Sequence, residues 1–339
     1  MTGIARRMGA RPIHEERDRD EDRPGGGGAA RGTSSPGATG RRWRSHNLPL
    51  LLIALPALLA LLVFYYLPML GIYIAFVDYR PARGVFGSEW VGFENFDFLF
   101  RSGDGWRITF NTVVMNSLFI VATLVTALAI ALMLNELRDR WKWLSRFYQS
   151  ILFLPYFFSY VIVSYFVMAF LDPDRGLVNH AFGLGQHNWY AEPGYWPIIL
   201  TVVSVWKGVG FWVIVYTAGI LAIGPELLEA AQIDGASKWR QIYHVILPIL
   251  TPLIIVQLLL SIGNIFRADF GLFYLVTNNS TLLYPSTDVI DTYIYRSMTK
   301  FGDIGMASAA GAYQCVVGFV LVVLANWLVR RRNPENALF

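Results

Sequence analysis

Six long apolar runs constrain this chain more than any other feature. They span residues 48–77, 112–134, 147–171, 196–223, 248–270 and 304–329. Each run is long enough to cross a bilayer core of about 30 Å at about 1.5 Å of rise per helical residue. Four runs contain no charged residue, whereas Lys207 lies in the fourth, and Arg267 and Asp269 lie near the end of the fifth. The sequence therefore predicts an all-α, polytopic membrane protein with six transmembrane helices.

Composition agrees with this fold class. Only 15% of the 339 residues are charged, compared with roughly 25% in soluble domains. The single cysteine, Cys315, excludes an intrachain disulfide. The net charge of +4 does not indicate a nucleic-acid partner, because the basic residues cluster beside the apolar runs in the way that membrane topology requires.

Basic residues at the ends of the runs predict the orientation. They precede the first run, fill the second connection and follow the last run: Arg41, Arg42, Arg44; Arg138, Arg140, Lys142, Arg146; Arg330, Arg331, Arg332. Such residues are enriched on the cytoplasmic side, and an even number of spans places all three groups there. We therefore expect a multi-pass protein of the cell membrane with both termini in the cytoplasm. The fourth connection, residues 224–248, is then cytoplasmic as well.

The two ends of the chain are predicted to lie outside the membrane domain, which spans residues 47–332. Residues 1–46 are rich in Arg, Asp, Glu, Gly, Ser and Pro. Such a segment buries too little apolar surface to offset its ordering entropy, so we predict a disordered cytoplasmic tail. It lacks the apolar core of a signal peptide. Residues 333–339 are expected to form a short cytoplasmic tail.

The fourth connection is a polar, helix-patterned segment between two apolar runs. Pro225 suits the first turn of a helix, which we expect to extend to about Ile233. Asp234 and Gly235 then favour a tight turn, and Ser237 can cap a second helix ending at 247–248. That helix carries an apolar stripe at helical spacing: Trp239, Ile242, Tyr243 and Ile246.

A bent helix pair with small residues exposed could enter the groove of another protein. The alternative is an ordinary interfacial helix pair without a partner. The order E-A-A, D-G-A and L-P at this spacing resembles the cytoplasmic coupling loop of ABC importer permeases, which docks on the nucleotide-binding subunit. The resemblance, with the neighbouring Trp239, assigns docking to Glu229, Ala230, Ala231, Asp234, Gly235, Ala236, Trp239, Leu247 and Pro248.

Further motifs are similar to the carbohydrate (maltose-type) branch of these permeases, especially those that serve oligosaccharides or polysaccharide fragments. They are Trp90 to Phe96, Asn111-Thr112, Leu154-Pro155, Gly176 to Asn179, Asp288 to Tyr295 and Ala309 to Gly311. The resemblance implies a type I importer fold with a five-helix core, a leading helix and cytoplasmic coupling helices. It also implies a carbohydrate substrate, a second homologous permease subunit, two ABC ATPase subunits and an extracytoplasmic solute-binding protein.

The sequence predicts no catalytic activity in this chain. A phosphate-binding loop of the form G-x-x-x-x-G-K-[ST] is absent, because none of the four lysines follows a glycine. ATP and Mg are therefore expected on the partner ATPase. No H-E-x-x-H motif, paired cysteine ligands or G-x-S-x-G elbow is present, so we predict no cofactor and no metal site.

Polar residues within the runs are candidates for the substrate path. A lysine in a membrane span is costly unless it faces a partner or a wet cavity. Lys207, next to Trp206, could line the path, paired with Asp269 or bonded to sugar hydroxyls, or it could bond a neighbouring carbonyl or snorkel. The outer end of the fifth run adds Asn264, Arg267, Asp269 and Tyr274, for which an interfacial Arg–Asp pair is the alternative. Tyr313 and Gln314 in the sixth run are weaker candidates.

Three functions fit a chain of this kind. The first is the permease subunit of an ATP-driven carbohydrate importer that works by alternating access. The second is a stand-alone secondary carrier, although such carriers commonly show internal repeats and none is evident here. The third is a membrane scaffold without transport, which would have no need for the helix pair in the fourth connection.

Overall fold

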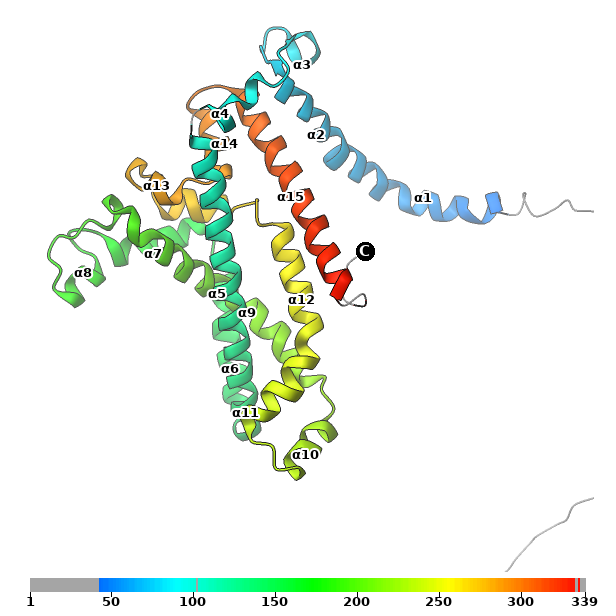
Figure 1. Cartoon of the computed structure of the whole chain (residues 1–339), viewed down its shortest axis with the longest axis vertical. Helices are drawn as coiled ribbons and strands as arrows, with labels where there is room; N and C mark the ends of the chain where they lie inside the picture. Colours follow the sequence, from blue (N-terminus) through cyan, green and yellow to red (C-terminus); the bar gives the residue numbers. More distant parts are fainter. Residues whose placement is uncertain (1–42, 102, 333–334, 336–339) are drawn as a thin grey trace, which may run out of the picture. The chain divides into compact units, whose positions relative to one another are not determined.

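The computed structural model describes residues 43–101, 103–332 and 335 (Figure 1). The chain divides into two compact parts, with the boundary after Leu61. In the first part, α1 covers Trp43–Leu61, so helix begins before the predicted end of the tail at residue 46. The rest of that tail lies outside the described residues, as does the predicted C-terminal tail except Glu335.

Helices dominate the second part. Its first connected helical segments are η1 (Leu62–Tyr66), α2 (Leu67–Met69) and η2 (Leu70–Phe76). The long helices and their neighbours are α5 (Asp104–Arg140), α6 (Lys142–Phe153), η4 (Leu154–Phe157), α7 (Tyr160–Leu171), α9 (Trp196–Leu221), α10 (Pro225–Ile233), α11 (Lys238–Gln241), η7 (Ile242–Ile246), α12 (Leu247–Gly263) and α15 (Ile304–Arg332).

Short elements fill the connections that are predicted to be external. The first holds β1 (Val77–Asp78), α3 (Gly84–Gly87), β2 (Glu89–Trp90), η3 (Glu94–Phe96) and α4 (Asp97–Phe100); β1 and β2 form a two-residue antiparallel pair with Val77 opposite Trp90. The second holds α8 (Leu177–Phe182), η5 (Trp189–Ala191) and η6 (Pro193–Tyr195). The third holds η8 (Gly271–Val276), η9 (Thr281–Leu283), α13 (Tyr284–Thr287) and α14 (Ile290–Thr299).

The described residues contain five helical segments long and apolar enough to cross a membrane, and a sixth if a bent pair is counted as one span. The five are Leu50–Phe76, Asp104–Arg138, Pro193–Leu221, Lys238–Gly263 and Ile304–Arg331. The bent pair joins Lys142–Phe157 to Tyr160–Leu171 at 102°. The all-α class is confirmed, and the third predicted span is a broken rather than a straight helix.

The break in the third span has a local cause. Pro155 lacks the N–H that a continuing helix requires, and the chain tightens there into η4. Ser159 then adopts an extended backbone, and its hydroxyl accepts a hydrogen bond from the Ile162 amide at 3.4 Å. An N-cap of this kind starts a new helix in a new direction, so α7 leaves the axis of α6.

The fifth span corrects two expectations from the sequence. The second helix of the fourth connection does not end at Leu247-Pro248, because one helical segment continues from Lys238 to Gly263. The widened π turn η7 directly precedes Leu247, and such a turn accommodates a proline that lacks an N–H and crowds the preceding turn. At its other end the helix stops at Gly263, so Arg267 and Asp269 lie in an irregular segment beyond it.

Close helix packing forms the core of the second part. Tyr216 on α9 donates a buried hydrogen bond to Gln257 on α12, a polar contact of the kind that joins membrane helices. A Cβ at Gly210 would collide with the backbone of Leu152 on α6, whereas one at Gly208 would meet open space. Of these two glycines on α9, Gly210 is therefore the one that allows the close approach.

Amide side chains tie the external connections together. Asn95 donates to the carbonyls of Ala75 and Val77 at 3.1 and 3.0 Å. Asn179 donates to three carbonyls and accepts from the Trp189 indole at 2.8 Å. Asn111 donates to the Asp288 carbonyl at 3.1 Å. These asparagines lie in motifs that suggested the family resemblance, and in this structure they hold loop backbone in place.

Candidate functional site: the α10–α11 helix pair and the polar cavity

The helix pair α10–α11 lies at one end of α5, opposite the end that carries α4 and α14 (Figure 1). Helix α10 covers Pro225–Ile233 as expected from the sequence, with Pro225 in its first turn. Gly235 follows with φ of +76°, a left-handed conformation that a residue with a Cβ adopts only at a cost. The bend between the two helices therefore depends on this glycine.

The start of α11 is not held by the serine cap that the sequence predicts. Ser237 has the extended backbone of an N-cap residue, but its side chain makes no capping hydrogen bond. The buried Gln241 instead donates to the Ala236 carbonyl at 2.9 Å. Lys238 pairs with Glu136 at the end of α5 at 3.1 Å. The first of these contacts closes the bend against α11, and the second joins it to the end of the long helix.

The predicted apolar stripe of the second helix divides into an inner and an outer half. Ile246 is buried, whereas Trp239 and Tyr243 are 74% and 67% exposed. Ile233 at the end of α10 is 86% exposed. These three form the outer apolar face of the pair. Large apolar side chains gathered on one projecting element are typical of a protein contact surface.

The predicted docking residues lie together on this pair except at its membrane end. Glu229, Ala230, Asp234 and Gly235 are exposed, and Ala231 and Ala236 are partly exposed. Leu247 and Pro248 instead lie in α12, where Pro248 is exposed and Leu247 is half-buried. The L-P step therefore belongs to the span that carries the pair rather than to its tip.

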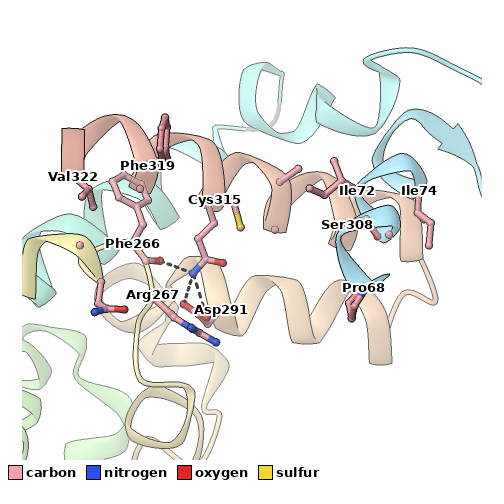
Figure 2. Close-up of a pocket in the computed structure, with 17 residues that line it drawn as sticks. Pro68, Ile72, Ile74, Phe266, Arg267, Asp291, Ser308, Cys315, Phe319 and Val322 are labelled. Atoms are coloured by element: carbon pink, nitrogen blue, oxygen red, sulfur yellow. Dashed lines mark hydrogen bonds between the residues drawn. The ribbon is translucent and has the colours of Figure 1, made fainter. Parts of the chain in front are cut away.

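A cavity of about 750 Å³ lies between η2, the end of α12 and α15 (Figure 2). Asn264 and Arg267 line it, as predicted for the substrate path. Gly311 also lines the cavity. A Cβ at this position would have no atom within 4 Å. The glycine therefore leaves room in the cavity and is not needed for a close contact between helices. Figure 2 shows Arg267 beside Asp291 on the cavity wall.

Asp291 and Gln314 form the polar centre of this cavity. The Gln314 amide donates to the Phe266 carbonyl at 2.6 Å and to both Asp291 carboxylate oxygens at 3.3 and 3.2 Å. The Ala268 amide donates to Asp291 at 2.8 Å. Burial raises the pKa of the Asp291 carboxyl, while these hydrogen bonds and the charge of Arg267 oppose the shift. The cavity wall thus offers a guanidinium, a carboxyl and amides to a polar ligand.

Sequence reasoning undervalued these two residues. Asp291 appeared only within the motif Asp288 to Tyr295, and Gln314 only as a weaker candidate for the substrate path. Gln314 did carry a signal in the sequence, because it is a polar residue within an apolar run. Polar groups at membrane depth face protein or water. Their meeting depends on the return of α14 against α15, which no local pattern specifies.

Lys207 lies at the broken third span. Its ammonium group donates to the Tyr156 carbonyl at 3.0 Å and lies 4.9 Å from the centre of the Tyr160 ring. No carboxylate pairs with it among the described side chains. The Asp269 carboxylate instead accepts a hydrogen bond from the Gly271 amide at 3.1 Å. The direct Lys207–Asp269 pair is therefore absent, and the carbonyl contact expected of a structural lysine is present.

The remaining path candidates lie outside the cavity. Trp206 is 40% exposed and contacts Phe158 and Phe166 near the break. Tyr274 stacks on Phe270 at 4.8 Å and meets Tyr295 edge-on at 5.0 Å. The ion pairs of the described residues do not join Arg267 to Asp269. The six candidates thus divide between the cavity, the broken span and an aromatic cluster.

Comparison with known proteins identifies the family. Residues 120–334 match the family described as binding-protein-dependent transport system inner membrane component. The chain belongs to this family. Membership makes it a multi-pass membrane protein of transport systems, in agreement with its apolar helices.

Relatives of this family member cover most of its length. The polygalacturonan/rhamnogalacturonan transport system permease protein YteP of Bacillus subtilis (strain 168) is 35% identical over 290 residues, covering 85% of this chain and 89% of that protein. Protein LplB of the same organism is 34% identical over 290 residues, covering 85% and 90%.

A solved structure shares the fold. The crystal structure of a bacterial ABC transporter involved in the import of the acidic polysaccharide alginate contains a chain that matches with a TM-score of 0.78 and 34% identity, covering 86% of this chain and 99% of that one. A second structure of a bacterial alginate ABC transporter, in complex with an alginate pentasaccharide-bound periplasmic protein, matches with a TM-score of 0.77. The fold of this chain is therefore that of an ABC importer permease.

Proposed function

We propose that this chain is the permease subunit of an ATP-driven importer for oligosaccharides or polysaccharide fragments. One matched transporter is named for polygalacturonan and rhamnogalacturonan and another for the acidic polysaccharide alginate, and both align along almost the whole membrane part. The family assignment argues against a stand-alone carrier and against a scaffold without transport.

The observation that carries the proposal is the exposed outer face of the helix pair α10–α11. No described residue covers Ile233, Trp239 and Tyr243, and the exposed pair Lys238–Glu136 joins the bend to α5. A separate ATPase that binds ATP and Mg would cover this face. Its closure would move the pair, and the continuous helix Lys238–Gly263 would carry the motion to the cavity.

The complete importer would contain two permease subunits, two ATPases and an extracytoplasmic solute-binding protein. In this arrangement both termini and the helix pair face the cytoplasm, as the basic residues predict. Binding energy at the ATPase then biases the equilibrium between inward-open and outward-open states, which is the requirement for coupling.

The substrate path would include the cavity wall at Asn264 and Arg267, together with Asp291 and Gln314. Arg267 is exposed and has no ion-pair partner among the described side chains. A guanidinium binds carboxylate oxygens in a fixed, forked geometry. This geometry suits the carboxylate of a uronic acid.

Reconstitution in proteoliposomes tests the function. The chain, its homologous partner permease and the ATPase should import a labelled oligosaccharide only with ATP and with the loaded solute-binding protein. Uptake driven by a proton gradient without any ATPase would contradict the proposal and would favour the stand-alone carrier.

Replacing Lys207 tests whether it serves the substrate path in addition to bonding the Tyr156 carbonyl. A hydrogen bond from the Lys207 ammonium group to substrate would contribute about 1.5–3 kcal/mol, so a path role predicts that Lys207→Met lowers the apparent affinity for substrate by about 10- to 100-fold. Size-exclusion chromatography of the complex provides the assembly control. Unchanged transport in an assembled complex would restrict Lys207 to the structural role.

A further inference from the structure

The elbow between α5 and α6 gathers positive charge that the transport function does not use. Arg138 lies in the last turn of α5, and Lys142 and Arg146 lie four residues apart on α6. The three side chains line a cavity of about 240 Å³. None of them forms an ion pair with a described side chain. The nearby Glu136 is already paired with Lys238 at 3.1 Å.

The elbow itself is firmly built. Trp141 is the single non-helical residue between the two helices, and its amide donates to the Leu137 carbonyl at 2.7 Å. The buried Ser145 hydroxyl donates to the Leu134 carbonyl at 3.0 Å. Like charges four residues apart on a helix repel each other, yet this geometry holds Lys142 and Arg146 next to Arg138. A bound anion would relieve that repulsion.

The depth of the elbow matches a lipid headgroup. The exposed apolar surface of α5 extends to Met133, which is 70% exposed. Arg138 lies five residues further, or roughly 7.5 Å along a helix. The polar headgroup zone adds about 5–7 Å to each side of the hydrocarbon core. The three cations therefore lie where the phosphates of a bilayer lie.

Aromatic side chains beside the cations supply an apolar surface. Trp143 and Phe147 stack at 5.7 Å between ring centres, and they are 72% and 47% exposed. Each directly follows one of the cations of α6 in the sequence, so the aromatic stripe runs alongside the basic one. Tryptophan is enriched at the membrane interface, and this pair can lie against an acyl chain while the cations hold the phosphate.

We propose that the α5–α6 elbow is a binding site for an anionic phospholipid, with Arg138, Lys142 and Arg146 on the phosphodiester group and Trp143 and Phe147 on an acyl chain. Arginine forks match phosphate oxygens, and basic pockets between membrane helices bind anionic headgroups. The site anchors the end of α5 that also carries the helix pair through the Glu136–Lys238 contact.

Lipid titration of the purified complex tests this site. Native mass spectrometry would count bound phosphatidylglycerol and phosphatidylcholine in the wild type and in the triple variant Arg138→Gln, Lys142→Gln, Arg146→Gln. Each basic residue near a membrane phosphate contributes about fivefold in affinity. The triple variant should therefore lose about 100-fold in affinity for phosphatidylglycerol and bind phosphatidylcholine unchanged.

A matched variant controls for the loss of charge. Arg83→Gln, Arg175→Gln, Lys300→Gln removes three exposed cations from the other connections and should leave phosphatidylglycerol binding within about twofold of the wild type. Equal phosphatidylglycerol binding by the wild type and the elbow variant would overturn the proposal. The proposal would also be overturned if the elbow variant lost the ATPase subunit but kept its lipid binding, because the elbow would then be a protein contact.

Discussion

Gly235→Val is expected to separate ATP hydrolysis from transport while leaving the membrane helices folded. Gly235 has φ of +76°, and a Cβ at this position would meet open space. The free-energy cost of a side chain therefore arises from the backbone conformation and not from a clash. A left-handed conformation costs an L-residue about 1–2 kcal/mol, which corresponds to about a 5- to 30-fold loss of the bent geometry. Substrate uptake should fall by up to that factor in reconstituted complexes.

Asparagine at the same position supplies the matched control. Asn tolerates the left-handed region far better than valine, so Gly235→Asn should retain most uptake. Glu229→Arg should also uncouple, because it reverses a charge on the exposed face of α10, and a partner surface complementary to Glu229 would repel an arginine. Wild-type uptake by both Gly235→Val and Glu229→Arg would refute the docking role of the pair.

Asp288→Asn is expected to produce the largest loss of stability among single substitutions in the external connections. The Asp288 side chain is fully buried and accepts two hydrogen bonds from Arg296, at 2.7 and 3.0 Å. Arg107 on α5 lies at 3.4 Å, and Thr292 donates to the same carboxylate at 3.0 Å. Neutralising Asp288 leaves Arg296, whose side chain is 12% exposed, without its charge partner.

Removing one partner of a buried ion pair costs about 3–5 kcal/mol. Thermal unfolding of the detergent-solubilised complex should therefore shift to clearly lower temperature in Asp288→Asn. The control is Asp97→Asn, which breaks an exposed ion pair. The Asp97 side chain is 44% exposed and that of its partner Arg101 is 80% exposed, so the loss should lower the free energy of unfolding by no more than about 1 kcal/mol. Equal shifts in the two variants would contradict a stabilising role for the buried network.

Local patterns in the sequence predicted the features that depend on a few neighbouring residues. Pro225 and Gly235 predicted the start of α10 and the bend after it, because each has one dominant backbone preference. Hydropathy predicted the membrane segments, since crossing the bilayer requires about 20 apolar residues whatever the surroundings. These features did not require knowledge of tertiary contacts.

Features that depend on the competition between two local effects were predicted less well. Pro248 was expected to end a helix, but the π turn η7 absorbs its missing hydrogen bond and the helix continues. Pro155 lies in an equally apolar run, yet there the chain breaks because Ser159 caps a new helix. Both prolines read alike in the sequence, and the residues around each decide between a bulge and a break.

The polar cavity could not be derived from the sequence because its members come from three separated segments. Arg267 follows α12, Asp291 begins α14 and Gln314 lies within α15. Their meeting depends on how the third external connection folds back, which is fixed by the buried contacts around Asp288 and Thr112. Such long-range pairing leaves no periodic signal in the chain.

Photo-crosslinking from position 239 tests the central claim most directly, namely that the helix pair contacts a separate ATP-hydrolysing subunit. A benzophenone amino acid would replace Trp239, which is 74% exposed, in the complex assembled in its native membrane. The account predicts a crosslinked product with the ATPase subunit, and a loss of that product when Phe86, 81% exposed in the first external connection, carries the probe instead. Crosslinks from position 239 to lipid or to an extracytoplasmic protein, with none to an ATPase, would contradict it.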